Sequence, residues 1–454
     1  MCRSARLVAQ LLTACALAVA AEQAAERFAL VADAGSTGTR MYLYRLPGDD
    51  GKVEVTVVGK GPPLSGFQAT PEKAAEAVAS QLAKAKELIP EASRASVHLS
   101  VFATAGMRLV PKAKQDAIYA GLRSGLLGAS GGYPFDANAI QARTISGREE
   151  GVFALLAANY LTKRLKTTLH AQTSSLMGVL DLGGSSTQVA TPPAVGAGEH
   201  LGPKLGSDHT FVRSFLNLGM ERMRQRTFQH FVDVAPAMQR ERKAVANPCS
   251  FYGYAEGDDS WRGTGEAAAC EAAVRAVLVD ERRECAAAAA KETPPTECLS
   301  KDPVPVPPGD TNAAKFFLIS GYLYVTDFAS WVLKLPGARP EALKSGVPAT
   351  PTIQELRDAA TVVCSEPWER LSAVGLDAER KHGFTPPKKL PHRCFELNYI
   401  VALLSLGYGF AEDARLFHIV EDIDGLEIEW TLGAFLQSLS TGSGTGDGTP
   451  FPEL

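Results

Sequence analysis

Two short segments of the sequence combine an aspartate, glycines and hydroxyl side chains in the same order. The first reads Asp33-Ala34-Gly35-Ser36-Thr37-Gly38-Thr39, and the second reads Asp181-Leu182-Gly183-Gly184-Ser185-Ser186-Thr187-Gln188. Glycine lets the backbone approach a ligand closely, and successive backbone N–H groups form a nest for an anion. The two segments therefore predict two phosphate-binding loops, which would hold one polyphosphate from both sides. A single such turn is weak support, because many are plain hairpins.

The aspartate of each segment ends an apolar run just before the glycines. Asp33 follows 28–32, and Asp181 follows 177–180. Mg²⁺ and Ca²⁺ take oxygen ligands, and Mg²⁺ in particular keeps several waters. Carboxylates at these two positions are suited to hold either cation through water.

Hydrolysis also needs an activated water, and two adjacent glutamates follow a helix start. Ser146-Gly147-Arg148-Glu149 is a capping box, in which Glu149 reaches back to the Ser146 amide. Glu150 points about 100° around the helix and is free to act as the general base. The alternative is that both carboxylates only complement the helix N-terminus.

Several other chemistries lack their motifs. The sequence contains no HExxH pair, no Gly-x-Ser-x-Gly elbow and no Walker A loop, so zinc-protease, serine-nucleophile and P-loop chemistry are not supported. With 46 basic and 50 acidic residues, the net charge of −4 disfavours a nucleic-acid partner.

Strands alternate with helices along the chain, which favours an α/β architecture. The strand, glycine turn and strand around Asp33 recur around Asp181, so we expect two related lobes that face each other across a cleft. Residues 316–331 are rich in aromatic side chains, one of which could stack on a nucleotide base.

The N-terminus indicates export. Arg3 and Arg6 precede an apolar run that ends in Ala18-Val19-Ala20, so residues 1–20 read as a signal peptide. An uncleaved anchor, or a lipid on Cys15, are the alternatives. Removal of the signal leaves six cysteines, an even number that indicates disulfides in a secreted or periplasmic protein.

Taken together, these segments resemble the apyrase family, the nucleoside triphosphate diphosphohydrolases and nucleoside diphosphatases, in its soluble exported branch. Five family blocks occur in order: VADAGSTGTR from Val31, FATAGMRLV from Phe102, ISGREEGVFALLAANYL from Ile145, VLDLGGSSTQVA from Val179, and CFELNYIVALLSLGYGF from Cys394 with EWTLGAF from Glu429. The resemblance covers nearly the whole chain after the signal.

The resemblance implies an actin-like fold of two ribonuclease-H-like lobes and a hydrolase that removes terminal phosphates from nucleoside tri- and diphosphates. It implies Glu150 as catalytic base and Mg²⁺ or Ca²⁺ as cofactor. Positions that match family phosphate ligands are Gly35, Ser36, Thr37, Gly38, Thr39, Thr104, Ala105, Gly183, Gly184, Ser185, Ser186 and Gln188. Positions that match the surroundings of the hydrated cation are Asp33, Asp181, Gln188 and Trp430.

The same resemblance implies that Tyr324 stacks on the base, and that Tyr252 stands where some members place an arginine against it. It implies the disulfides Cys249–Cys285, Cys270–Cys298 and Cys364–Cys394. We expect lobe I to comprise 27–146 and about 421–440, lobe II 147–420, and 441–454 to be a flexible tail. A monomer without a membrane span after signal cleavage is expected.

Two alternatives of different kinds remain. An exopolyphosphatase or guanosine pentaphosphatase shares this architecture, but typically has Glu where Gln188 stands. A nucleotide-binding protein without catalysis would be the other. A comparison of phosphate release from ADP and from long polyphosphate distinguishes the first alternative from a nucleotide hydrolase. Binding of nucleotide without turnover would identify the second.

Overall fold

The computed structural model describes residues 26–48, 51–128, 133–193, 210–235, 245–256, 261–290, 297–307, 314–337, 340–420 and 422–440. The expected signal peptide, Cys15 and the tail from residue 441 lie outside these residues. Two compact units divide the chain. One lies within Met1–Ile145 and Ala434–Glu453, and the other within Ser146–Gly433. No helix in the described part of the chain is both long and apolar enough to span a membrane.

The first unit is built on a five-stranded sheet with strand order β3-β2-β1-β4-β5. Its strands are β1 (Arg27–Gly35), β2 (Gly38–Leu46), β3 (Glu54–Gly61), β4 (His98–Ala103) and β5 (Ile140–Thr144). The three strands β1, β2 and β3 pair antiparallel, and β4 and β5 continue parallel to β1. This mixture arises because a two-residue turn joins β1 to β2, whereas β4 and β5 need helical crossovers.

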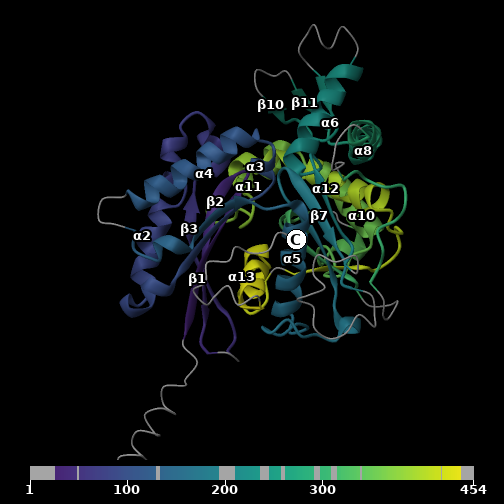
Figure 1. The fold of residues 1–454 in the computed structure, drawn as a ribbon. Helices are drawn as coiled ribbons and strands as arrows, with labels where there is room; N and C mark the ends of the chain where they lie inside the picture. The colour runs from purple at the N-terminus through teal and green to yellow at the C-terminus, as the bar shows by residue number, and fades with distance from the viewer. Residues whose placement is uncertain are drawn as a thin grey trace, which may run out of the picture. The chain divides into compact units, whose positions relative to one another are not determined.

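Helices cover this sheet. They are α2 (Ala79–Leu88), α3 (Ala105–Arg108) and α4 (Lys112–Leu127), with 3₁₀ turns at Leu64–Gln68, Pro71–Ala77, Glu91–Ser96 and Ala137–Ala139. Figure 1 shows α2 and α4 alongside the sheet, and their apolar side chains, such as Leu82 and Leu122, share one core with Leu30 of β1.

The second unit repeats the same topology. Its sheet has the order β13-β12-β6-β7-β8, with β6 (Gly178–Leu182), β7 (Ser186–Ala190), β8 (Val212–Leu216), β12 (Phe316–Ser320) and β13 (Phe417–Ile419). Again the first three strands in sequence pair antiparallel and the last two continue parallel to the first of them. The two units thus share one arrangement, in which β6 is the counterpart of β1. The strand order in each unit is that of a ribonuclease-H-like lobe, and the fold is of the actin-like class that the resemblance implies.

The second unit carries the larger set of helices. They are α5 (Gly147–Leu161), α6 (Met220–Val234), α8 (Ala267–Ala289), α9 (Gly321–Lys334), α10 (Ile353–Cys364), α11 (Trp368–Gly375) and α12 (Arg393–Ala402). A π-helical turn at Leu403–Gly407 follows α12, and 3₁₀ turns lie at Thr173–Ser175, Glu341–Leu343 and Pro387–His392. A small sheet has the order β10 (Ala255–Glu256), β11 (Trp261–Gly263), β9 (Val245–Asn247). Helices α10 and α12 lie side by side in Figure 1 and share one apolar core.

Strand alternation separates the two faces of the second sheet. Val189 of β7 contributes to the core that includes α9, α10 and α12. Its neighbour Gln188 faces the other way, toward α5. A Cβ added to Gly151 of α5 would lie 2.8 Å from Val212 and 3.6 Å from the Cβ of Gln188. Glycine at this position therefore lets α5 approach β7 and β8 closely.

The last helix, α13 (Trp430–Ser440), begins in the second unit and continues into the first. Trp430 stacks on Phe153 of α5 with 6.2 Å between ring centroids, and a Cβ on Gly433 would lie 1.9 Å from the Phe153 carbonyl oxygen. The first unit resumes at Ala434, within α13.

Three disulfides lie in the second unit, and two of the expected pairings are wrong. Cys364–Cys394 is confirmed, but Cys249 pairs with Cys270 and Cys285 with Cys298, not Cys249 with Cys285 and Cys270 with Cys298. Helix α8 is the reason. It carries Cys270 near its start and Cys285 near its end, about 22 Å apart at 1.5 Å per residue. Cys249 lies beside the start of α8, with its Cα 4.8 Å from that of Cys270, and Cys298 lies beside the end, with its Cα 5.7 Å from that of Cys285. A disulfide needs Cα atoms within about 7 Å, so the crossed pairs cannot form in this arrangement.

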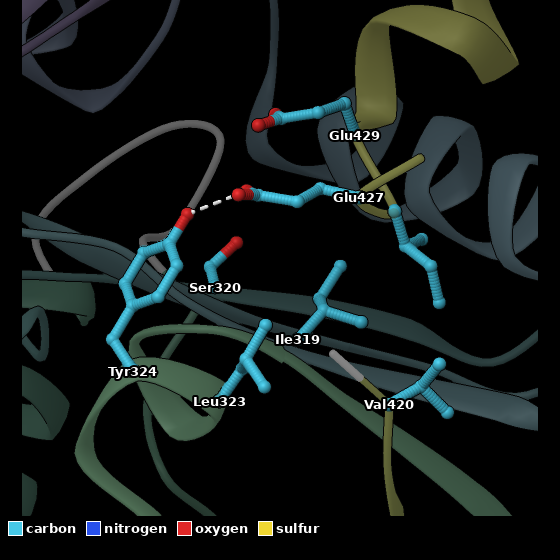
Figure 2. Close-up of a pocket in the computed structure, with 8 residues that line it drawn as sticks. Ile319, Ser320, Leu323, Tyr324, Val420, Glu427 and Glu429 are labelled. Atoms are coloured by element: carbon cyan, nitrogen blue, oxygen red, sulfur yellow. Dashed lines mark hydrogen bonds between the residues drawn. The ribbon is translucent and has the colours of Figure 1, made fainter. Parts of the chain in front are cut away.

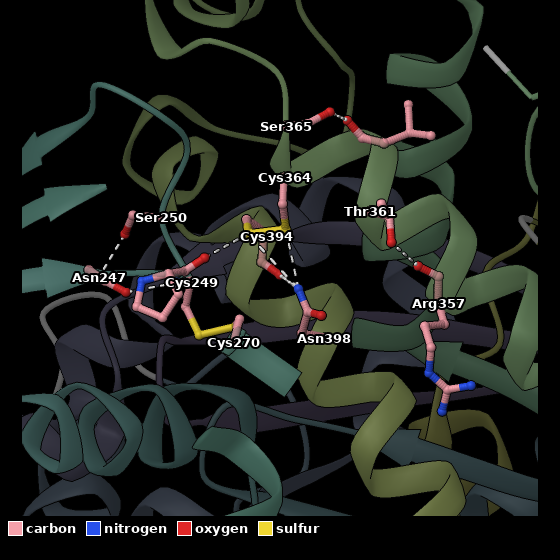
Figure 3. Close-up of a disulfide and its surroundings, with 12 residues drawn as sticks. Asn247, Cys249, Ser250, Cys270, Arg357, Thr361, Cys364, Ser365, Cys394 and Asn398 are labelled. Atoms are coloured by element: carbon pink, nitrogen blue, oxygen red, sulfur yellow. Dashed lines mark hydrogen bonds between the residues drawn. A yellow bond between two sulfur atoms is a disulfide. The ribbon is translucent and has the colours of Figure 1, made fainter. Parts of the chain in front are cut away.

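The disulfides Cys249–Cys270 and Cys364–Cys394 lie close together, as Figure 3 shows. The amide of Asn398 donates to the carbonyl of Cys394 at 2.8 Å and lies 3.2 Å from the sulfur of Cys364. Cys249–Cys270 links the chain after β9 to α8, and Cys364–Cys394 links α10 to α12. All four cysteines are fully buried in the interior of the unit.

Candidate active site

The predicted base lies at the start of α5, where the capping box forms as expected. The Ser146 hydroxyl accepts a hydrogen bond from the Glu149 amide at 3.1 Å, and the Glu149 carboxylate accepts one from the Ser146 amide at 2.7 Å. Glu149 is thereby committed to the helix terminus. Glu150 points elsewhere and is 7% exposed. Its carboxylate is largely shielded from solvent, but it contacts a neighbouring polar side chain.

That neighbour is Gln188 on β7. Its Nε2 atom donates to Oε2 of Glu150 at 3.2 Å, and it also lies 2.8 Å from the hydroxyl of Ser186 and 3.0 Å from that of Ser214. Gln188 is buried. Three acceptors around one amide nitrogen restrict the orientation of its side chain.

Asp181 lies on β6 directly opposite Gln188 in the strand register. It is 5% exposed, and burial raises the pKa of its carboxyl to about 7, with further upward contributions from Glu150 and then Glu429. A hydrogen bond from Ser320 and one from the Leu182 backbone lower it in part. Asp181, Glu150 and Glu429 thus concentrate negative charge in a buried region, which favours either a proton or a cation.

The donor set at this position consists of oxygens, which suits Mg²⁺ or Ca²⁺ rather than a metal that prefers nitrogen or sulfur. Within the described ranges, no group of three or more His, Cys, Asp or Glu side chains is arranged to hold a metal ion. Trp430, stacked on the same helix that carries Glu150, is 5% exposed.

The second glycine turn joins β6 to β7 and is anchored to the start of α6. The Gly183 amide donates to the Ser186 carbonyl at 2.9 Å, which closes the turn. The carbonyl oxygens of Gly183 and Gly184 accept hydrogen bonds from the first amides of α6, each at 3.0 Å. A Cβ on Gly219 would lie 2.3 Å from the Ser185 amide nitrogen, so only glycine allows α6 this close. Ser185 and Ser186 are buried.

The first glycine turn occupies the same place in the first unit. Gly35 pairs with Gly38, so Ser36 and Thr37 form a two-residue hairpin turn between β1 and β2. Asp33 faces Arg40 across this hairpin, with 3.8 Å between its carboxylate and the guanidinium. Arg40 is thus the counterpart of Gln188 in the repeat. The hydroxyl of Thr39 is buried and donates to a carbonyl of the chain after β3.

Thr104 and Ala105 lie beside this first turn. The Thr104 amide donates to the Ala34 carbonyl at 3.3 Å, and both residues are buried. A Cβ on Gly106 would lie 2.9 Å from the Cα of Ser36, so glycine lets this segment pack against the turn. A Cβ on Gly38 would lie 2.4 Å from Cε of Lys60, which places this lysine beside the turn.

A pocket in the second unit lies between the end of β12, the start of α9 and residues 427–429 (Figure 2). Tyr324 lines it together with Ser320, Glu427 and Glu429, and its hydroxyl donates to Glu427 at 2.9 Å. The Tyr324 ring stacks on Phe384 with 5.4 Å between centroids. Tyr252 is 64% exposed and does not line this pocket.

Sequence reasoning missed several residues of this site, among them Ser320, Ser214, Glu429 and Phe384. Ser320 ends β12 with φ 56° and ψ −120°, a conformation that serine rarely adopts and that is often found at functional sites. It is the counterpart of Thr104, which follows β4 in the other unit. The repeat could have revealed Ser320, because each apolar strand ends in a hydroxyl residue shortly before a glycine.

Comparison with known proteins shows the family of the chain. Residues 19–443 match the GDA1/CD39 (nucleoside phosphatase) family. A guanosine-diphosphatase of Schizosaccharomyces pombe is 29% identical over 94% of this chain and 76% of its own length. Ectonucleoside triphosphate diphosphohydrolase 2 of Mus musculus is 27% identical over 91% of this chain and 83% of its own length.

A solved structure of nucleoside triphosphate hydrolases from Neospora caninum superposes on the chain with a TM-score of 0.59. It covers 97% of this chain and 98% of that one at 16% identity, which supports the shared fold. The chain belongs to the GDA1/CD39 nucleoside phosphatase family, and it is a hydrolase.

Proposed function

We propose that the protein is an exported, divalent-cation-dependent hydrolase that removes terminal phosphates from nucleoside tri- and/or diphosphates. The observation that carries this proposal is the contact of Glu150 with Gln188, opposite Asp181 and next to the second glycine turn. A carboxylate held by a polar amide, beside an aspartate proposed to bind the cation, is suited to act as general base on a water that attacks a phosphate. Family membership and the names of the relatives support the same class of reaction.

In the proposed reaction, Glu150 takes a proton from a water, and the oxygen of that water attacks the terminal phosphorus in line with the leaving oxygen. A bound Mg²⁺ or Ca²⁺ would neutralise charge on the phosphate oxygens. Asp181, Gln188, Asp33 and Trp430 are the residues proposed to surround its hydration shell. The burial of Asp181 and its raised pKa support a cation there, because cation charge offsets the cost of the buried carboxylate.

Both glycine turns are proposed to bind the phosphates of one substrate. Supporting features are the buried hydroxyls of Thr39, Thr104, Ser185 and Ser186, and the close packing that glycine permits at each turn. Preorganised backbone amides and hydroxyls stabilise developing charge without reorganisation, which is the largest contribution in many such enzymes. Each turn is closed by backbone pairing within its own unit, so the donors are held before substrate binds.

Tyr324 is proposed to stack on the nucleotide base. Tyr324 lies on the wall of a pocket that also contains Ser320 and Glu429. Ser320 donates a hydrogen bond to Asp181, so this pocket adjoins the proposed catalytic site, where a bound nucleotide would place its base nearby. For Tyr252 the structure gives no such support, since it is largely exposed and lies outside the pocket lining. Its role in base binding therefore stays a prediction from the resemblance.

Export is proposed from three disulfides, which form in oxidising compartments, and from the signal-like N-terminus. Release of inorganic phosphate from ATP, ADP, GDP, UDP and long polyphosphate, with Mg²⁺ or Ca²⁺, tests the proposed activity. Turnover of nucleotides that disappears in the Glu150→Gln protein is expected. Turnover of polyphosphate alone, or of no substrate at all, would overturn the proposal.

A further inference from the structure

In the described part of the chain, the strand β8 lies at the edge of the second sheet, and one of its residues contacts the side chain that holds the proposed base. Ser214 pairs with Gln188 across β7 and β8, and its hydroxyl lies 3.0 Å from Nε2 of Gln188. The neighbouring ladder bonds, from Asn217 to Ser185 and from Thr191 to Phe211, make this a pair without mutual backbone hydrogen bonds. Side chains of such pairs approach most closely.

The backbone amide of Ser214 therefore points away from β7, toward the edge of the sheet, where it donates a hydrogen bond to a carboxylate. Oε2 of Glu297 accepts a hydrogen bond from this amide at 2.7 Å. Oε1 of the same carboxylate lies 3.7 Å from the guanidinium of Arg213. A hydrogen bond to a charged acceptor is about twice as strong as a neutral one. Glu297 thus holds β8 in place at Ser214, the residue that pairs with Gln188.

The position of Glu297 is itself restrained. The next residue, Cys298, is bonded to Cys285 of α8, and the Cys285 sulfur lies 3.8 Å from the Glu297 carbonyl oxygen. The disulfide attaches this segment to a 23-residue helix that contributes to the apolar core. The restraint matters because Glu297 and Ser214 lie on different segments of the chain, 83 residues apart in sequence.

We propose that Glu297 is a positioning residue for phosphate hydrolysis. Glu297 holds Ser214 against Gln188, and Ser214 in turn limits the orientation of the Gln188 amide. That amide orients the Glu150 carboxylate. The Cys285–Cys298 disulfide keeps Glu297 in position. This role rests on the proposed function, in which Glu150 is the base. Every link is a contact within the second unit.

The competing explanation is a surface ion pair between Glu297 and Arg213 that only contributes to stability. Both side chains are partly exposed, 36% and 44% respectively, and such pairs contribute little. The geometry favours the positioning role, because the 2.7 Å contact is with the Ser214 amide and the 3.7 Å contact is with the arginine. The two roles differ in what they change, since only the positioning role alters the chemical step.

The test compares steady-state hydrolysis of a nucleoside diphosphate by the full chain and its variants. Glu297→Ala is expected to lower kcat about tenfold, the lower end for groups that orient active-site ligands, with KM changed less than about twofold. Glu297→Gln keeps an oxygen that can accept from Ser214, and should retain most of the kcat. Glu284→Ala is the matched control, because Glu284 is an exposed carboxylate beside Cys285 that pairs with Arg226 at 2.7 Å.

Combined variants test the order of the contacts. If Glu297 acts through Ser214, the double variant Glu297→Ala/Ser214→Ala should lose about as much kcat as the more damaging single change, not the product of both losses. Cys285→Ser/Cys298→Ser should lower kcat in the same direction, and adding Glu297→Ala should lower it little further. A normal kcat in Glu297→Ala, a loss equal to that of Glu284→Ala, or multiplicative losses would overturn the proposal.

The outcome for Glu150→Gln separates this proposal from the proposed function. Loss of turnover in Glu150→Gln together with normal turnover in Glu297→Ala would overturn only the positioning role. Retained turnover in Glu150→Gln would overturn the assignment of the base, and the positioning role with it. Melting temperatures of all variants exclude loss of folded protein as the cause.

Discussion

The side-chain amide of Gln188 donates a hydrogen bond to the carboxylate of Glu150 across 3.2 Å, from the second strand of a hairpin to the first turn of a helix. Glycine at position 151 allows the helix to approach the strand this closely. The adjacent Glu149 is held by the helix terminus. Two neighbouring carboxylates therefore have different partners, and the following predictions depend on that difference.

Glu150→Gln should lower kcat by about 10²-fold or more, because amide in place of carboxylate cannot accept a proton from water. Folding should be intact, since the amide fills the same space. Glu149→Gln is the matched control. It keeps an oxygen that can accept from the Ser146 amide, so activity should stay near normal. Equal losses in the two variants, measured by phosphate release, would contradict the assignment of Glu150 as base.

Asp181→Asn should stabilise the metal-free protein at high pH. The folded-state pKa of Asp181, about 7, lies above its ordinary value of 3.8, so the folded protein binds more protons than the unfolded chain between these values. Wild-type stability therefore falls as pH rises from about 4 to about 7, and stays reduced above that range. Asparagine has no charge to bury and can still accept the hydrogen bond from Ser320.

The expected gain in the free energy of unfolding at pH 8 is at most about 4 kcal/mol, and it should vanish near pH 4. Thermal melts with a chelator at several pH values measure it. The same variant should be nearly inactive, because the proposed cation loses a ligand to its hydration shell. If Asp181→Asn is less stable than wild type at pH 8, the ionised Asp181 carboxylate does not destabilise the folded protein.

Chelation of divalent cations should abolish turnover and leave the fold intact. We expect the fold to be independent of the ion, because each unit has its own apolar core and the second unit also has three disulfides. Phosphate release should return when Mg²⁺ or Ca²⁺ is added back after EDTA. Far-ultraviolet circular dichroism in EDTA is the control. Undiminished turnover in chelator would remove the cation from the mechanism.

Tyr324→Ala should raise KM for nucleotides by about tenfold, on the scale of a lost base–aromatic contact, with little change for substrates that lack a base. Tyr324→Phe keeps the ring but loses the hydrogen bond to Glu427, and should resemble wild type. Tyr252→Ala serves as the comparison, because Tyr252 is exposed and outside the pocket. Initial rates across substrate concentrations distinguish the three variants.

Local patterns were sufficient to predict much of the fold and part of the site. The repeat around Asp33 and Asp181 predicted two related sheets, and both have the same strand order. The Ser146 capping box separated Glu149 from Glu150, because a capping box depends only on residues within one helical turn. Such features are readable because their partners lie close in sequence.

Contacts between distant segments were not predictable in this way. Glu297 meets Ser214 across 83 residues, and no spacing or periodicity signals that pair. The conformation of Ser320 depends on the junction of β12 with α9 and on Asp181 from another strand. The disulfide pairing was wrong for a related reason, since Cys249 and Cys298 lie beside opposite ends of α8, and the order of the cysteines does not reveal this.

Peptide mapping of the oxidised protein should recover Cys249–Cys270, Cys285–Cys298 and Cys364–Cys394. Digestion without reduction, followed by mass spectrometry, identifies each linked pair. Removing Cys364–Cys394 by a double change to serine should lower the free energy of unfolding by about 3 to 4 kcal/mol, because the bond closes a loop across a separation of 30 residues. The separation across Cys285–Cys298 is 13 residues, so its removal should cost somewhat less, about 3 kcal/mol. Recovery of a Cys249–Cys285 peptide would contradict this arrangement, since those cysteines lie beside opposite ends of α8.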